Sequence, residues 1–152
     1  MRAGGTDRIR LAVPCDLEAV VSLAGQLWPG HAPGELQEEL EPLLSSDEAA
    51  FALVFDDNGR PAGFAQCQLR HDYVEGSAGS PTAYLEGIFV REDCRRRGLA
   101  RELQRACEDW ARGHGCTEMG SDCSLDNAAS ERYHLHAGFQ EVNRIICFIK
   151  EI

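Results

Sequence analysis

Three strand patterns at the centre of the chain constrain its fold most, because helical patterns bracket them on both sides. Residues 50–55, 61–70 and 83–90 are mostly apolar, and an Asp-Asn-Gly turn joins the first two segments as a hairpin. Residues 98–112 then carry apolar side chains at helical spacing. Strands and helices that alternate in this way predict a sheet with helices packed against it.

The flanking segments extend this pattern over nearly the whole chain. Upstream, we expect a strand at residues 8–13 and helices at 16–28 and 36–44, the second kinked or ended by Pro42. Downstream, we expect a short strand at 118–122, a helix at 127–137 and strands at 139–142 and 144–150. The prediction is a single α/β (α+β) domain over residues 1–152, a central mixed, mostly antiparallel sheet flanked by about four helices, with a flexible start at residues 1–7.

Charge and hydropathy exclude several classes of function. The net charge of −10 argues against nucleic acid as the main partner and favours cationic ligands, although many bacterial cytosolic proteins are simply acidic. No apolar run reaches the ~18 residues of a membrane-spanning helix, and residues 1–7 lack the apolar core of a secretory signal. We therefore expect a cytoplasmic protein with no membrane partner.

The cysteine pattern predicts reduced, mostly buried thiols. The seven cysteines are odd in number and include no CxxC pair, so neither a disulfide framework nor a zinc site is expected. His134 and His136 stand two apart on an expected helix and cannot face one metal ion. We expect no metal.

The strongest chemical signal is Arg95-Arg96-Arg97-Gly98-Leu99-Ala100, which links a strand to a helix. Free N–H groups at the start of a helix form an anion site, and a glycine lets a ligand approach the backbone closely. Taken alone, the segment has two interpretations: a cradle for a diphosphate, or a charged turn before an amphipathic helix.

Further along the chain, Asn127 opens a helix that ends in Ala137-Gly138-Phe139. Together with the strand, RxxGxA segment and helix described above, this resembles the GNAT superfamily of acetyl-CoA-dependent N-acetyltransferases. The resemblance implies acetyl-CoA as cosubstrate, with its pantetheine arm entering where the sheet splays. The residues implied in binding it are Ile88, Phe89, Val90, Arg95, Arg96, Arg97, Gly98, Ala100, Asn127 and His134.

A narrower resemblance runs from about residue 8 to the end of the chain. Residues 27–31, 70–76, 85–90 and 116–122 look like the corresponding segments of aminoglycoside 6'-N-acetyltransferases, the antibiotic-modifying branch. This implies a cationic aminoglycoside as substrate. The residues implied in its binding are Trp28, His31, Tyr73, Glu86 and Asp122. Three of these also have a structural interpretation: Trp28 as a core aromatic, Tyr73 at a strand edge, and Asp122 as an acid that follows a strand.

Glu86 stands out because it is an acid in an otherwise apolar strand. An unpaired carboxylate is costly to bury there, and the neighbouring Gly87 predicts a β-bulge that re-aims side chains. Acetyl transfer requires a neutral amine, so we predict that Glu86 binds the substrate ammonium and accepts its proton, with Asp122 as a second catalytic carboxylate. A backbone N–H near Ile88 or Phe89 would stabilise the oxyanion. The alternative is that Glu86 is a paired structural acid.

One position departs from the superfamily pattern. Many members carry a tyrosine four residues before the glycine of the "GF" segment, where it serves as general acid, and this chain has His134 there. The proton donor to the departing thiolate therefore stays open between His134, a water molecule and no acid at all.

Two other functions compete with aminoglycoside acetylation. One keeps the fold and changes the acceptor to a polyamine, an amino acid or a peptide terminus, and the other is a non-catalytic acyl-CoA-binding sensor. Relatives are commonly dimers, and residues 144–150, rich in Ile and Phe, suit an interface, so a homodimer is expected.

Overall fold

The computed structural model describes residues 8–32 and 34–152, so the flexible start expected at residues 1–7 lies outside the described part. The elements are β1 (Ile9–Leu11), the 3-10 turn η1 (Pro14–Asp16), α1 (Leu17–Leu27), α2 (Glu35–Leu44), β2 (Ala49–Phe55), β3 (Pro61–Arg70), β4 (Thr82–Val90), the 3-10 turn η2 (Glu92–Cys94), α3 (Leu99–Gly113), β5 (Met119–Gly120) and α4 (Ala128–His136).

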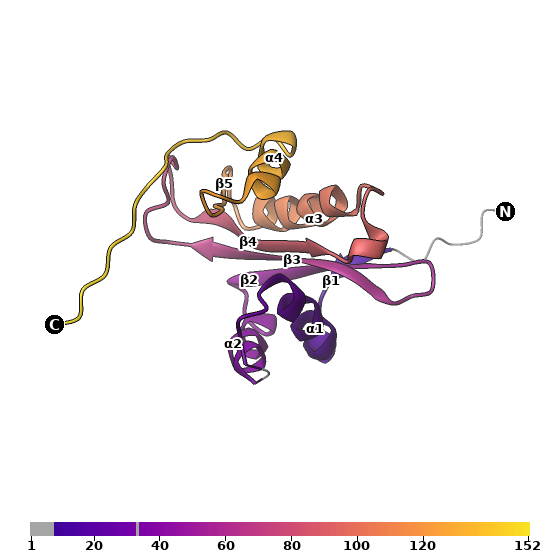
Figure 1. The fold of residues 1–152 in the computed structure, drawn as a ribbon. Coiled ribbons are helices and arrows are strands. Elements are labelled where there is room, and N and C mark those ends of the chain that lie inside the picture. Colours follow the sequence, from indigo (N-terminus) through magenta and orange to yellow (C-terminus); the bar gives the residue numbers. More distant parts are fainter. Residues whose placement is uncertain (1–7, 33) are drawn as a thin grey trace.

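The strands form one sheet in the order β1-β2-β3-β4-β5. The first four strands are antiparallel neighbours, whereas β5 runs parallel to β4 and pairs only at Ala83↔Met119 and Tyr84↔Gly120. Helices α1 and α2 cover one face, and α3 and α4 cover the other (Figure 1). The predicted class, a mixed and mostly antiparallel sheet flanked by four helices, is confirmed.

The hydrophobic core has two halves, one on each face of the sheet. Strand β2 contributes to both, since Ala52 and Val54 pack toward α3 while Phe51 and Leu53 pack toward α1 and α2. A strand that is buried on both faces has apolar residues at every position, and this explains the continuous apolar run of β2.

All seven cysteines are free thiols. Four of them are buried and three are exposed: Cys67, Cys94, Cys107 and Cys116 lie inside, and Cys15, Cys123 and Cys147 lie on the surface. In the part of the chain that the structure describes, no helix is long and apolar enough to cross a membrane.

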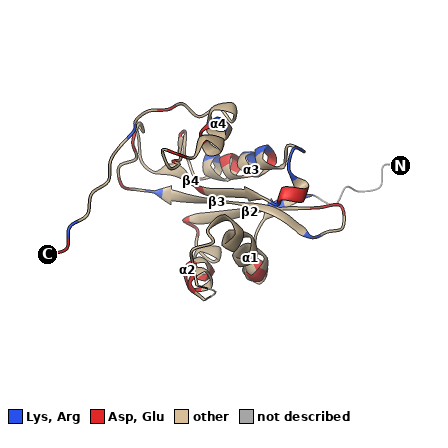
Figure 2. Ribbon diagram, viewed as in Figure 1, with Lys and Arg blue, Asp and Glu red and all other residues tan. Residues whose placement is uncertain are grey.

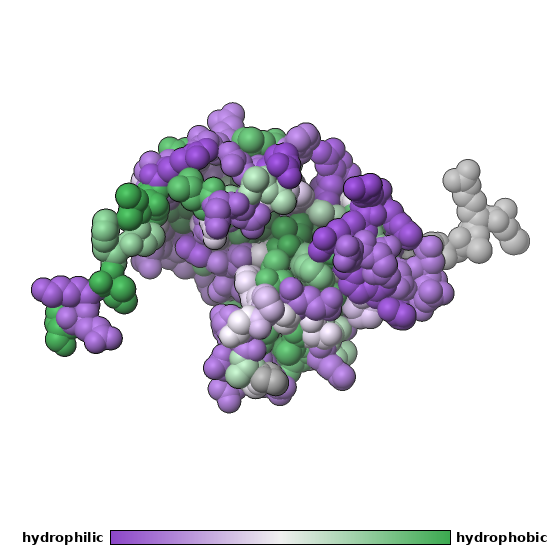
Figure 3. Space-filling model, in the orientation of Figure 1, coloured by the Kyte–Doolittle hydropathy of each residue, from purple (hydrophilic) through white to green (hydrophobic). Residues whose placement is uncertain are grey.

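Of the two effects expected of Pro42, a kink or an end, the end at its own position is excluded, because α2 continues to Leu44. One other sequence-based expectation is wrong. Residues 139–142 and 144–150 form no strand. Phe139 packs against the core, whereas residues 144–150 run as extended chain away from the sheet (Figures 1 and 3). Their pattern is that of a strand, but β5 is only two residues long and nothing in residues 8–32 and 34–152 pairs with the C-terminal segment.

Candidate active site

The pairing of β4 with β3 is interrupted in the middle of β4. Across from β3, Gln66 pairs with Gly87 and Cys67 pairs with Leu85, so Glu86 has no partner and forms a β-bulge. On the other side of β4, pairing with β5 stops after Tyr84. The bulge predicted from Glu86 and Gly87 is confirmed, and it lies where β4 and β5 part.

Glu86 is held by Arg70, the last residue of β3. The guanidinium donates to both carboxylate oxygens, with Nη2 at 2.9 Å from Oε1 and 2.8 Å from Oε2. Burial raises the pKa of the Glu86 carboxyl, and the contact with Arg70 lowers it in part. The carboxyl is therefore paired, as a buried acid must be, and its partner is a cation.

The same guanidinium lies over an aromatic ring. The Cζ atom of Arg70 is 3.5 Å from the centroid of the Tyr84 ring, a cation–π contact. The Tyr84 hydroxyl donates to the carboxylate of Asp122. Burial raises the pKa of Tyr84 well above its ordinary value, so Tyr84 remains a hydrogen-bond donor at physiological pH.

These contacts join the two predicted catalytic acids into one cluster. Glu86, Arg70, Tyr84 and Asp122 form a continuous network of ion pair, cation–π contact and hydrogen bond. We call these four residues the acidic cluster. It contains two carboxylates and one arginine, so it carries a formal excess of negative charge and suits a second cation, such as a substrate ammonium.

Trp28 lies against Gly87, the residue that follows Glu86 in β4. Its ring packs edge-on against Phe64 with centroids 6.1 Å apart, and a Cβ on Gly87 would come within 2.6 Å of Trp28 Cζ2. Gly87 therefore allows the indole to lie against the bulge of β4. Trp28 is half-buried. Its interpretation as a core aromatic is therefore compatible with a position next to the bulge of β4.

His31 and Tyr73 lie in two exposed loops and do not join the acidic cluster. The His31 Nδ1 atom is 3.6 Å from Glu35, and the Tyr73 hydroxyl donates to Glu75 at 3.4 Å. Tyr73 is 78% exposed, which is high for a tyrosine that would line a pocket. Their assignment to the substrate pocket stays a prediction.

The start of α3 forms the expected concave backbone. Gly98 has a φ of +75°, a left-handed conformation that favours glycine, and no side chain of the described residues caps this helix. Arg96 precedes it with a φ of +65°. Helix geometry leaves the N–H groups of the first turn without helical partners, so they remain available to an anion.

Basic side chains surround this helix start, as the blue loop before α3 in Figure 2 shows. Arg96 and Arg97 are exposed, whereas Arg95 donates from Nε to the carbonyl of Val90 at 2.8 Å. A pocket of about 400 Å³ continues from Gly98 and Ala100 along α3 to Tyr133 and His136 on α4. Arg95 therefore ties the loop to the end of β4, while its two neighbours are free for a phosphate.

The remaining residues that are predicted to bind the cofactor lie on β4 and at α4. Ile88, Phe89 and Val90 follow the bulge and pair with Ala65, Phe64 and Gly63 on β3. Asn127 caps α4, because its side chain accepts from the N–H of Ser130 at 3.1 Å. His134 lies on α4 and contacts Ser121 just after β5.

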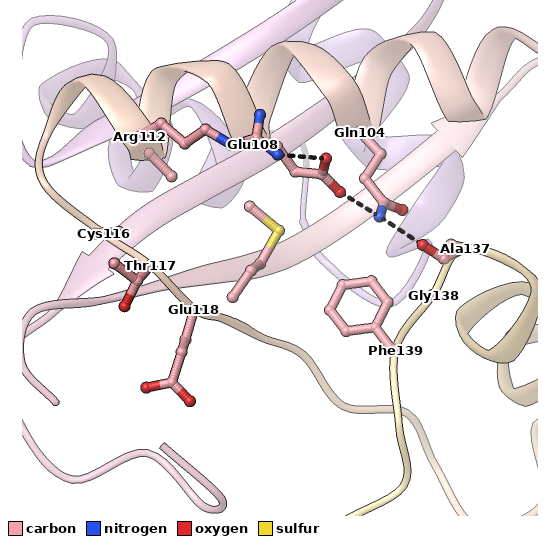
Figure 4. A pocket seen from close by; sticks show the side chains of 11 residues that line it. Gln104, Glu108, Arg112, Cys116, Thr117, Glu118, Ala137, Gly138 and Phe139 are labelled. Carbon is pink, nitrogen blue, oxygen red and sulfur yellow. Dashed lines mark hydrogen bonds and ion pairs between the residues drawn. The ribbon is translucent and has the colours of Figure 1, made fainter. Parts of the chain in front are cut away.

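A second pocket of about 450 Å³ lies between α3, β5 and the segment after α4 (Figure 4). Gln104 and Glu108 line it from α3, Met119 from β5 and Phe139 from beyond α4. None of its lining residues belongs to the acidic cluster.

Sequence reasoning missed Arg70, Tyr84 and Ser121 as individual site residues. Arg70 gave no signal in the sequence, because its contact with Tyr84 depends on the pairing of β3 with β4. Tyr84 could have been found, since it stands two residues before Glu86 on one strand and such residues share a face. Among residues 8–32 and 34–152, no group of three or more His, Cys, Asp or Glu side chains is arranged to hold a metal ion.

The parting of β4 from β5, the bulge at Glu86 and the helix start at Gly98 follow one another along the chain, and comparisons with known proteins assign the chain that carries them to a family. Residues 17–139 match the acetyltransferase (GNAT) family. The chain belongs to this family.

Within it, the chain is most informatively compared with aminoglycoside 6'-N-acetyltransferases. It is 41% identical over 134 residues to aminoglycoside N(6')-acetyltransferase type 1 of Salmonella enteritidis, covering 88% of this chain and 92% of the relative. The enzyme of the same name from Serratia marcescens is 35% identical, with coverage of 93% and 99%. The solved structure of AAC(6')-Iy in complex with the bisubstrate analogue CoA-S-monomethyl-acetylneamine superposes with a TM-score of 0.90 at 40% identity, covering 95% of this chain and 97% of that chain.

Proposed function

We propose that this protein transfers the acetyl group of acetyl-CoA to the 6'-amine of aminoglycoside antibiotics and thereby confers resistance to them. The observation that carries the proposal is the acidic cluster at the bulge of β4, in a GNAT chain that is 41% identical to an aminoglycoside N(6')-acetyltransferase. Aminoglycosides carry several ammonium groups, and two adjacent carboxylates are suited to bind them.

Glu86 acts on the attacking amine. Its carboxylate binds the substrate ammonium and accepts one proton, directly or through water, because an alkyl ammonium with a pKa near ~10.4 is otherwise not nucleophilic at neutral pH. The neutral nitrogen then attacks the thioester carbonyl carbon. As the N–C bond forms and the C–S bond breaks, the electron pair of the C–S bond leaves with sulfur, and the nitrogen loses its second proton.

The other residues bind and orient the two substrates. The N–H groups at the start of α3, with Gly98, Ala100 and the arginines before them, hold the diphosphate of acetyl-CoA. Ile88, Phe89 and Val90 on the open edge of β4 lie along the pantetheine arm. Asp122, Trp28, His31 and Tyr73 bind the sugar rings on the other side of Glu86.

Two alternative functions predict different results in an activity assay. An acetyltransferase for a polyamine, an amino acid or a peptide terminus would use the same cradle, and a sensor would bind acyl-CoA without turnover. A thiol-release assay with acetyl-CoA against kanamycin, spermidine and a lysine peptide separates them. We expect release with kanamycin at low concentration and little with the others; release with spermidine or peptide alone would favour the first alternative, and binding without release the second.

We place the enzyme in the cytoplasm. All seven cysteines are free, and reduced thiols are typical of that compartment.

We further propose that the protein is a homodimer in which each C-terminal segment packs on the other copy. Its apolar side chains are exposed: Ile145 by 70%, Ile146 by 79%, Phe148 by 89% and Ile149 fully. Such a segment is stable only when a partner covers it. The start of the C-terminal segment is held in place, because the side-chain amide of Asn143 donates to the carboxylate of Glu75 at 3.1 Å.

The occupant of the complementary surface is a second copy of the chain. Strand β5 has no partner among the described residues on its outer edge, and the pocket between α3 and β5 (Figure 4) lies next to that edge. Because each copy supplies one segment and one edge, two copies satisfy each other with twofold symmetry.

Light scattering on a sizing column tests this arrangement. We expect a dimer for the parent, a monomer for the double variant Ile146→Asp with Phe148→Asp, and a dimer for the control Leu125→Asp, whose side chain is 75% exposed outside the segment. A monomeric parent, or a double variant that stays dimeric, contradicts the proposal.

A further inference from the structure

The loop between β3 and β4, residues 71–81, is closed on itself and fixed to the start of β5. The Ser80 hydroxyl donates to the carbonyl oxygen of His71 at 3.0 Å. The carboxylate of Glu118, the residue just before β5, accepts from the N–H of Ala78 at 2.9 Å. The loop therefore has a defined position, although most of its residues are exposed.

One apolar side chain of this loop, Val74, lies against the acidic cluster. Val74 is only 7% exposed. A Cβ on Gly120 would come within 2.8 Å of Val74 Cγ1 and 3.0 Å of Tyr84 Cδ2, so both side chains lie against the same Cα of β5. Tyr84 is a member of the cluster. Tyr73 and Glu75, the exposed neighbours of Val74, therefore flank a contact with the cluster.

The carboxylate of Glu75 is oriented by two uncharged donors. The Tyr73 hydroxyl donates to Oε2 at 3.4 Å, and the side-chain amide of Asn143 donates to Oε1 at 3.1 Å. Among the residues that the structure describes, no lysine, arginine or histidine forms an ion pair with Glu75. The carboxylate is thus held in place, and its charge is not compensated by a cation of the chain.

Asp122 shares this property, whereas many surface acids do not. Glu102, for example, pairs with Arg8 at 3.0 Å, so its charge is compensated within the chain. Asp122 accepts from the Tyr84 hydroxyl and, within residues 8–32 and 34–152, forms no ion pair. Uncompensated carboxylates that are held near one another suit a ligand that brings several positive charges of its own.

We propose that Glu75 binds an ammonium group of the aminoglycoside other than the 6'-amine and thereby helps to determine which acceptors bind. The inference rests on the proposed acetylation of aminoglycosides and adds a specificity-determining residue to it. Glu86 takes the reacting amine at the bulge of β4, and Glu75 contacts a second cation from the loop beside Tyr84. Each oxygen of Glu75 has one of its two acceptor positions in use, so the ammonium displaces no existing contact.

Such a contact adds affinity without acting on the chemical step. The ammonium that Glu75 binds does not react, so the contact is the same in the bound substrate and in the transition state. Its removal should therefore raise KM for the antibiotic and leave kcat nearly unchanged. The contact also favours acceptors that carry several positive charges on a rigid frame, as aminoglycosides do, over an acceptor with a single amine.

Two antibiotics and a neighbouring acid test this assignment. Neomycin and paromomycin differ only at the 6' carbon, which carries an amine in the first and a hydroxyl in the second. Calorimetry measures the affinity of both antibiotics for the parent, Glu75→Gln and Asp72→Asn. Asp72 is the matched control, because it is an exposed acid of the same loop and its substitution changes the net charge equally. Steady-state kinetics with neomycin give kcat and KM, and circular dichroism establishes that each variant is folded.

We expect Glu75→Gln to bind both antibiotics ~10-fold more weakly than the parent, since one charge-assisted contact is lost. The two losses should be equal, because the ammonium concerned is not at the 6' carbon. KM for neomycin should rise by a similar factor, whereas kcat and the KM for acetyl-CoA should stay within ~2-fold of the parent values. Asp72→Asn should change either affinity by less than ~2-fold, as expected of an exposed charge without a partner.

Parental affinity for both antibiotics in Glu75→Gln overturns the assignment. Equal losses in Glu75→Gln and Asp72→Asn also overturn it, because they would show long-range attraction by the charge of the loop. A loss confined to neomycin would place the contact at the 6'-amine and contradict the proposal as well. Calorimetry needs no turnover, so an inactive parent that binds both antibiotics through Glu75 would contradict the proposed acetylation and not this contact.

Discussion

The carboxyl of Glu86 is subject to two opposing effects. Burial in β4 raises its pKa, and the bidentate contact with Arg70 lowers it in part. Arg70 thus shows that this position accepts a cation close to the carboxylate. A substrate ammonium that approaches Glu86 would meet a carboxyl whose raised pKa makes its carboxylate a better base than that of an ordinary glutamate.

Replacing Glu86 by Gln should therefore affect the chemical step most. The change preserves shape and removes the base, so kcat for kanamycin should fall ~10²–10⁴-fold at neutral pH. The defect should shrink as the pH rises, because more of the substrate amine is already neutral. The control is Glu102→Gln, a carboxylate of α3 paired with Arg8 at 3.0 Å and remote in sequence from the bulge. Parental kcat in Glu86→Gln would reduce Glu86 to a binding or structural acid.

The pH dependence of kcat/KM in the parent enzyme shows in which direction the pKa of Glu86 is shifted. Glu86 is active when deprotonated, so kcat/KM should rise with pH through its folded pKa. Since burial raises that pKa, the rising limb should lie above the ordinary glutamate pKa of ~4.3. In Arg70→Gln the pKa-lowering partner is gone, so the limb should move to still higher pH. A limb that moves to lower pH in this variant contradicts the assignment.

A substitution at Gly98 tests whether the start of α3 binds the diphosphate of CoA. Gly98→Asp places a negative charge where the diphosphate of CoA is expected, and loss of a charge-assisted contact amounts to roughly tenfold to over a hundredfold in affinity. Gly115→Asp is the control, because Gly115 also has a positive φ (+82°) and open space around a Cβ, but it lies beyond the opposite end of α3. Calorimetry should show weakened CoA binding only for Gly98→Asp; equal affinities in the two variants would remove Gly98 from the site.

At the scale of elements, most of the fold follows from local pattern. The hairpin of β2 and β3, the long helix α3 and the bulge at Glu86 all have signals within a few adjacent residues, and each was predicted from them. Arg70 and Tyr84 could not be assigned in the same way, since their contact is set by the register of two strands. The sequence predicts which segments are extended, but not which side chains face each other across strands.

The C-terminal strands illustrate the same limit. The alternation of apolar residues in residues 144–150 is genuine, and it predicts that the segment pairs as a strand. A strand also needs a neighbour, and residues 8–32 and 34–152 of one copy supply none. Strand propensity describes a segment and not the chain that completes its hydrogen bonds.

Asp56 anchors the β2–β3 hairpin to the end of β4. Its carboxylate accepts from the N–H groups of Asn58 and Arg60, both at 2.9 Å, and from Arg91 at 2.9 Å. The N–H of Arg60 and the guanidinium of Arg91 hold the pKa of Asp56 below its ordinary value. A carboxyl with a lowered folded pKa contributes stability above the unfolded pKa of ~3.9, and this is lost as the pH falls through the folded value.

Urea unfolding of Asp56→Asn measures this contribution. At pH 7 the variant should have a lower midpoint than the parent, and the gap should narrow as the pH falls below ~3.9. The control is Asp57→Asn, because Asp57 is exposed in the same turn and should leave the midpoint nearly unchanged. A gap that is constant from pH 7 to below the carboxyl range would show that Asp56 acts through shape and not through charge.

For the molecule as a whole, basic and acidic side chains gather on different elements, and we expect the two substrates to bind to different elements as well. The helix start that is expected to bind the anionic cosubstrate follows β4 and carries arginines, whereas α2 carries glutamates, as the colours in Figure 2 show. The net charge of −10 is therefore compatible with a basic cradle for CoA. Between the two regions lies the bulge of β4, where we expect the attacking amine and the thioester to meet.

The most direct measurement of the central claim uses two antibiotics that differ at one atom position. Neomycin has an amine at the 6' carbon, and paromomycin has a hydroxyl there. Thiol release from acetyl-CoA should be rapid with neomycin and absent or very slow with paromomycin, and mass spectrometry of the neomycin product should show a single added acetyl group. Equal release with both antibiotics, or none with neomycin, would contradict acetylation of the 6'-amine.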